Sequence, residues 1–88
     1  MKEEVFALVA FSSTHSAIKA EKELTRHELD VKIIPVPREI TAGCGLSIRF
    51  DLSDLKQVKK IIDDNNIETS GYYHIKKIGL NKEIKTIF

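Results

Sequence analysis

The chain has 88 residues, of which 42% are apolar and 31% charged, and this composition fits one small domain because so short a chain can close only a single core. Fourteen basic and thirteen acidic residues leave a net charge of +1, which excludes the strong overall field that drives non-specific binding to nucleic acids. We therefore expect a single domain over residues 1–88.

The sequence shows no membrane or targeting segment. No run of about 18 apolar residues is present, as a membrane span would need. The apolar run that follows Glu4 is shorter than the hydrophobic region of a signal peptide. We expect a cytoplasmic protein.

Apolar periodicity predicts the first two elements. Residues 4–11, EVFALVAF, form a nearly continuous apolar run that is typical of a strand buried on both faces. Serine and threonine residues that can cap a helix come next, and Ala17, Ala20 and Leu24 then recur at spacings of three and four. We expect a helix from Thr14 to Leu29.

Four further segments follow in chain order. Residues 31–36, VKIIPV, are short and β-branched and indicate a strand that closes near Pro35, which cannot donate to a sheet ladder. Residues 46–51, LSIRFD, alternate as in a half-buried strand. A second helix is expected after a cap at Asp51 or Ser53, ending near Asn65–Asn66, with an apolar stripe of Leu55, Val58, Ile61 and Ile62. Residues 69–79 indicate a fourth strand, and the last nine residues form either a short edge strand or a tail.

The order β-α-β-β-α-β predicts an α+β fold, the ferredoxin-like split βαβ sandwich, in which two helices cover one face of an antiparallel sheet. In this fold the first and third strands are neighbours. The segment Ser12–His15 and the loop before the third strand then lie at the same end of the sheet, next to the free N–H groups that open the first helix. We take this end as the candidate site.

The only cysteine, Cys44, lies in an eleven-residue break from Pro35 to Gly45. A lone cysteine cannot form an internal disulfide, so any chemistry it performs is an exchange with a thiol or sulfur donor on another molecule. Connections between paired strands usually have two to five residues, and the longer one favours a function. The flanking Gly43 and Gly45 permit unusual backbone conformations and leave the sulfur accessible. The alternative is that Cys44 is a small apolar side chain at the entrance of a strand.

Three residues near Cys44 could tune its reactivity. Arg38 and the helix N-terminus at Ser13 could each stabilise the thiolate and lower the pKa of the thiol, and His15 could accept its proton. Arg38 could instead brace the loop by bonding to backbone carbonyls, and His15 could be an exposed neighbour of the helix cap. The residues alone leave these alternatives open.

The run PVPREITAGCGLSIRF, with FSSTHSAIKAEKEL upstream, resembles the selenium/sulfur carrier protein-like family of small bacterial proteins. The most specific part is Pro37, Arg38, Glu39 and Ile40, followed by Cys44-Gly45 at the start of a strand. The resemblance implies a carrier rather than a stand-alone enzyme, with sulfur or selenium held on Cys44 as a persulfide or selenosulfide. It also implies a cysteine desulfurase or another donor and an acceptor enzyme as partners, and no cofactor. Where family loops often place serines, this chain has Thr41, Ala42 and Gly43, so a role for serine hydroxyls has no counterpart here.

A second hypothesis belongs to another class: a small RNA-binding or protein-interaction module with an inert cysteine. It would use the open face of the sheet, through stacking and charge, with the residues Arg49, Tyr72, Tyr73, Lys76 and Lys77. A metal site is not expected, because one cysteine and the histidines His15, His27 and His74 lack the paired spacing of zinc ligands.

Overall fold

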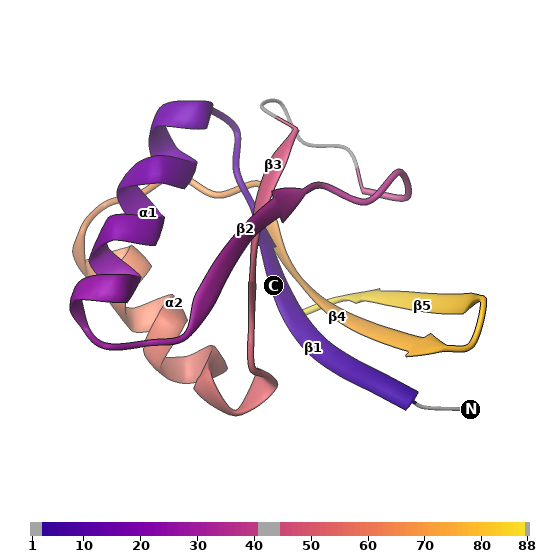
Figure 1. The fold of residues 1–88 in the computed structure, drawn as a ribbon. Coiled ribbons are helices and arrows are strands. Elements are labelled where there is room, and N and C mark those ends of the chain that lie inside the picture. The colour runs from indigo at the N-terminus through magenta and orange to yellow at the C-terminus, as the bar shows by residue number, and fades with distance from the viewer. Residues whose placement is uncertain (1–2, 41–44, 88) are drawn as a thin grey trace.

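The computed structural model describes residues 3–40 and 45–87, and it has two helices beside one sheet (Figure 1). The elements follow in the order β1 (Glu3–Ala10), α1 (Thr14–Arg26), β2 (Val31–Pro35), β3 (Leu46–Phe50), the 3-10 helix η1 (Leu52–Asp54), α2 (Leu55–Asp64), β4 (Gly71–Ile78) and β5 (Asn81–Thr86). No helix in these described ranges is long and apolar enough to cross a membrane.

The sheet has five strands in the order β2-β3-β1-β4-β5, and every neighbouring pair is antiparallel. The expected α+β class, with an antiparallel sheet and two helices on one face, is confirmed, as is the pairing of the first and third strands. The predicted order β-α-β-β-α-β counts four strands, whereas the sheet has five; of the two alternatives for the last nine residues, the edge strand is the one that the structure shows. The last residues form a fifth, edge strand, because Gly79 takes a left-handed φ of 59° that turns the chain back beside β4.

The main core lies between the sheet and the two helices. Ala17, Ala20 and Leu24 of α1 are fully buried against it, as the spacing predicted. From the other helix come Val58, Ile61 and Ile62, again as predicted. Strand β1 supplies Ala7 and Val9, every second residue, as the two-residue period of a strand requires, and we call this side of the sheet the helix face.

The opposite, outer face of the sheet carries a second apolar cluster. It consists of buried residues from β1, from β4 and from the loop after β2, namely Phe6, Leu8, Ala10, Ile40 and Ile75, and we call it the outer cluster. Strand β1 is therefore buried on both faces, which confirms the interpretation of its continuous apolar run.

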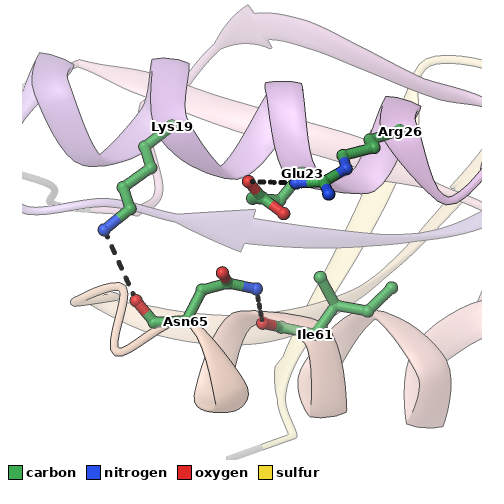
Figure 2. A network of polar contacts seen from close by, with 5 residues as sticks. All are labelled: Lys19, Glu23, Arg26, Ile61 and Asn65. Atoms are coloured by element: carbon green, nitrogen blue, oxygen red, sulfur yellow. Dashed lines mark hydrogen bonds and ion pairs between the residues drawn. The ribbon is translucent and has the colours of Figure 1, made fainter.

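Helices α1 and α2 lie side by side, and one hydrogen bond joins α1 to the residue that ends α2 (Figure 2). Lys19 of α1 donates a hydrogen bond from Nζ to the backbone oxygen of Asn65 at 3.5 Å. Asn65 in turn donates from Nδ2 to the backbone oxygen of Ile61 at 2.8 Å and so satisfies a carbonyl at the end of α2. These contacts fix the end of α2 against the first helix.

Helix α1 ends three residues earlier than the predicted Leu29. Glu28 takes a left-handed φ of 64°, and the backbone N–H groups of Glu28 and Leu29 donate to the carbonyls of Thr25 and Leu24. This is the Schellman arrangement, which turns Leu29 back to pack against the main core. The second helix also begins later than its predicted cap, because Asp51 caps η1 by accepting from the backbone N–H of Ser53 at 2.9 Å.

Candidate functional site

The loop that carries Cys44, which we call the cysteine loop, connects β2 to β3, and its two ends stay hydrogen-bonded to each other beyond the last pair of the two strands. Pro35 and Leu46 form the last registered pair of β2 and β3, and Val36 then donates its backbone N–H to the carbonyl of Gly45 at 2.9 Å. This bond reduces the predicted eleven-residue break to residues 37–44.

Gly45 has the backbone conformation that the sequence analysis attributed to the glycines beside the cysteine. Its φ is +71°, in the left-handed region that favours glycine. A Cβ built at Gly45 would meet no other atom within 4 Å, so the glycine is favoured by the backbone conformation and not by a close neighbour. Cys44 and Gly43 lie outside the described residues, and Gly45 is the closest described residue to the cysteine in the chain.

The first turn of α1 is at the same end of the sheet as Gly45. Ala10, the last residue of β1, pairs with Ser47, so the segments that extend beyond this pair, Ser12–Ser13 on one strand and Gly45 on the other, leave the sheet together. This confirms the expectation that the start of the first helix and the entrance of the third strand share one end.

Ser13 is the N-cap of α1, and its Oγ accepts a hydrogen bond from the backbone N–H of Ser16 at 3.1 Å. His15 is exposed on the first turn, which contains no acidic residue. One residue before the cap, Ser12 Oγ donates a hydrogen bond to the Glu68 carboxylate at 3.4 Å. The partial positive charge of the helix N-terminus is thus not neutralised by an acid within its own turn.

The Pro-Arg-Glu-Ile run forms a turn that packs on the outer face of the sheet, on the side away from α1 (Figure 1). Ile40 donates its backbone N–H to the carbonyl of Pro37 at 3.0 Å, and its side chain, 5% exposed, joins the outer cluster. Glu39 forms an ion pair with Lys82 of β5 at 3.8 Å. This anchor was not predicted from the sequence, although the isoleucine that directly follows the charged pair Arg38-Glu39 was a signal for it.

Arg38 lies on this turn, between the anchored Glu39 and Pro37. Its side chain forms no hydrogen bond or ion pair with any residue in 3–40 and 45–87. The structure therefore brings Ser13, His15 and Gly45 to one end of the sheet and places the turn that carries Arg38 on the outer face.

A buried hydroxyl holds the beginning of β3 beside this site. Ser47 is fully buried, and its Oγ donates to the backbone carbonyl of Ile34 at 3.2 Å. Because a buried hydroxyl without a partner costs free energy, this bond favours the present register of β2 and β3. This register places Gly45 next to Val36, where the cysteine loop ends.

The residues proposed for an RNA-binding face do not gather on one face. Tyr72 belongs to the main core on the helix face, and Lys76, four residues along the same strand, pairs with Glu3 at 3.6 Å. Tyr73 packs against the outer cluster. Arg49 is on that face too, where it forms an ion pair with Glu4 and lies over the ring of Phe6. The outer face is thus largely occupied by the chain's own side chains.

Metal ligands do not cluster in the part of the chain that the structure describes: it holds no group of three or more His, Cys, Asp or Glu side chains that could bind an ion.

Comparison with known proteins gives one family. Residues 6–74 match the family described as "Putative Se/S carrier protein-like", so the match runs from β1 into β4, includes Cys44 and leaves β5 outside. A protein of Methanocaldococcus jannaschii, "Uncharacterized protein MJ0011", is 33% identical over 61 residues, which are 69% of this chain and 30% of that protein. The chain thus spans less than a third of the length of this relative. No solved structure matches the chain.

Proposed function

This chain belongs to the Se/S carrier protein-like family, and from that membership together with the geometry at Gly45 we propose that Cys44 carries a sulfur or selenium atom between two partner enzymes. The observation that carries the proposal is that Gly45, where the cysteine loop ends, is exposed and has a left-handed backbone conformation. It directly follows the cysteine and leaves the sheet at the end where α1 begins.

The chemistry that we propose is a transfer without net oxidation. The Cys44 thiolate attacks the outer sulfur of a persulfide on the donor enzyme, a new S–S bond forms, and the donor thiolate leaves with the electron pair of the broken S–S bond. The acceptor repeats the same step on the Cys44 persulfide, and Cys44 returns to the thiolate. Selenium would follow the same path as a selenosulfide.

Three described residues are proposed to assist this step. The N-terminus of α1, capped by Ser13, favours negative charge at the end of the sheet where Gly45 lies. His15, exposed on the same turn, can accept the thiol proton. Arg38, on the turn that packs on the outer face of the sheet, can stabilise the thiolate from that face.

The proposal also places the protein in a reducing compartment. A carrier thiol must stay reduced between transfers, which the cytoplasm provides. The partners follow from the chemistry: a cysteine desulfurase or another enzyme that presents a persulfide, and an acceptor enzyme. We further propose that β1 to β4 and the two helices follow the ferredoxin-like path, with β5 added at the edge.

Loading tests the proposal. The chain is incubated with a cysteine desulfurase and sulfur-labelled cysteine, and bound label is measured after separation under non-reducing conditions. We expect one labelled sulfur atom per wild-type chain, removable by reductant, and none on Cys44→Ser. An unlabelled wild-type chain would reject the carrier function and leave Cys44 as a packing residue.

A further inference from the structure

Strand β5 forms one edge of the sheet, on the side away from both helices, and no strand of the described chain lies beyond it (Figure 1). The backbone N–H of Ile87 donates to the carbonyl of Tyr72 at 2.7 Å, one pair beyond the registered ladder of β4 and β5. Hydrogen-bonded and non-hydrogen-bonded pairs alternate in an antiparallel ladder, so every second residue of β5 turns its backbone N–H and C=O away from β4. These residues are Lys82, Ile84 and Thr86.

The opposite edge of the sheet, β2, is closed to further strands by a proline. The bond from Val36 to Gly45 sets the alternation of this ladder and places the outward backbone groups on Val31, Ile33 and Pro35. Pro35 has no N–H to donate, and proline on an edge strand discourages pairing with another chain. Strand β5 contains no proline, so its edge can accept a further strand.

Two exposed residues of opposite charge, Glu83 and Lys85, flank Ile84 on β5. Glu83 lies opposite Lys76 in the ladder, but Lys76 forms its ion pair with Glu3 of β1 at 3.6 Å. Neither Glu83 nor Lys85 forms an ion pair with any residue that the structure describes. Both charges are therefore available to a partner at this edge.

We propose that a second copy of this chain pairs with β5, edge to edge and antiparallel, about a two-fold axis at Ile84. This register sets Glu83 of each copy opposite Lys85 of the other, so two pairs of opposite charge form. It also sets the outward-facing residues opposite one another, Ile84 with Ile84 and Lys82 with Thr86. The main chains then exchange about six hydrogen bonds.

The charges of β5 select this register over its neighbours. An axis at Glu83 or at Lys85 would set that residue opposite its own copy, and like charges directly opposite each other are destabilising. On the outer face, Ile84 packs against the outer cluster, so in the proposed register the outer clusters of the two copies meet through their Ile84 side chains. The joined sheet ends in β2 on both sides, where Pro35 stops further growth.

The interface does not depend on the carrier function, because it needs no chemistry at Cys44 and lies on the strand that the family match leaves outside. The first test is sedimentation of the full chain in the presence of reductant, which prevents a disulfide between two Cys44 residues. We expect a reversible dimer between about 10 µM and about 1 mM protein, the range of a small interface.

Hydrogen exchange locates the dimer contact. The backbone amides of Lys82, Ile84 and Thr86 face solvent in the monomer, so their exchange should slow as the protein concentration rises. The amides of Glu83 and Lys85 already bond to β4 and should change less.

Charge reversal tests the register. Glu83→Lys and Lys85→Glu each turn two attractive pairs into two repulsive ones, so each variant alone should dimerise about 30-fold more weakly. An equimolar mixture of the two variants restores both pairs and should form heterodimers with wild-type affinity. The double variant Glu83→Lys/Lys85→Glu should form homodimers again. Lys22→Glu, a charge reversal at an exposed position of α1, is the control and should dimerise as the wild type does.

Glu83 and Lys85 are exposed, so the reversed chains keep the fold, and recovery in the mixture verifies it. A wild-type chain that stays monomeric at about 1 mM would overturn the proposal and leave the β5 edge to a strand of another protein. A dimer without slowed exchange at Ile84, or charge-reversed chains that dimerise as the wild type does, would overturn it as well.

Discussion

Ile40 is the residue that attaches the described part of the cysteine loop to the rest of the protein. It follows the charged residues Arg38 and Glu39, yet its side chain is as buried as that of Phe6, which belongs to the same cluster. The ion pair between Glu39 and Lys82 lies beside it at the surface. Most of the stabilisation at this anchor therefore comes from apolar burial, because exposed ion pairs contribute little.

Replacing Ile40 tests this anchor. Ile40→Ala should lower the free energy of unfolding by about 2 kcal/mol, through lost burial and a cavity in the outer cluster. Glu39→Gln, the matched control in the same turn, should change it by less than about 0.5 kcal/mol. Urea denaturation measures both variants. Equal effects of the two substitutions would show that the turn is not held by Ile40.

The effect of the Arg38 guanidinium on the Cys44 thiol can be tested by alkylation. If its guanidinium stabilises the Cys44 thiolate, Arg38→Ala raises the pKa of that thiol and slows alkylation by iodoacetamide at neutral pH about fivefold. Arg26→Ala, an exposed arginine at the end of α1, is the control and should react at the wild-type rate. The fold should persist, since the Arg38 side chain has no polar contact with another described residue. A wild-type rate in Arg38→Ala would remove Arg38 from the site.

At the scale of elements, helix α1 both packs on the sheet and presents its first turn at the end of the sheet where the cysteine loop lies. Its buried stripe holds it on the sheet, and its first turn presents free N–H groups at the cysteine end. Ser13 orders this turn as the N-cap. Any effect of Ser13 on the cysteine is thus expected to act through the geometry of the helix start.

Removing the cap measures its contribution. Ser13→Ala should cost about 1 kcal/mol of stability, because the backbone N–H of Ser16 loses its acceptor. The adjacent Ser12→Ala loses only a long, exposed contact to Glu68 and should be nearly neutral. Thermal or urea unfolding of the two variants decides the matter. A neutral Ser13→Ala would mean that the cap bond does not stabilise the helix.

Periodicity predicted the elements well and the loops poorly, for physical reasons. The stripes of α1 and α2 and the two-sided burial of β1 repeat along the sequence, so a pattern identifies them. The left-handed turn at Glu28 uses a residue that gives no glycine signal, and so the predicted end of α1 was too late. The position of the Pro37–Ile40 turn on the outer face depends on contacts with distant strands, which no local pattern contains.

The proposed RNA face was wrong for a different reason, because a local pattern argued against it. Tyr72 and Tyr73 are adjacent in one strand, and adjacent strand residues point to opposite faces. The structure accordingly buries Tyr72 in the main core and leaves Tyr73 on the outer side. The alternation of side chains along a strand is enough by itself to place these two tyrosines on different faces.

For the molecule as a whole, Tyr72 makes stability depend on pH in the alkaline range. Burial, reinforced by the nearby Asp63 carboxylate, raises the pKa of Tyr72 above its ordinary value. Above about pH 10 the unfolded state releases this proton while the folded state retains it, so stability falls as pH rises, by up to about 1.4 kcal/mol per pH unit.

Tyr72→Phe should remove this part of the alkaline destabilisation, because phenylalanine has no proton to release. Tyr73→Phe, on the outer side, is the control for general alkaline effects such as lysine titration. Urea unfolding from about pH 8 to about pH 11 gives the three profiles. Parallel profiles for wild type and Tyr72→Phe would contradict the assignment.

A carrier must pass its chalcogen atom on, so release of the atom tests the proposed function more directly than loading. Wild-type chain carrying labelled sulfur is separated from the desulfurase and incubated with an acceptor thiol, and the label on each component is followed with time. We expect that label leaves the chain and appears on the acceptor as a persulfide, while Cys44→Ser never carries it. Label that stays on Cys44 in the presence of excess acceptor would contradict a carrier and leave only a modified cysteine.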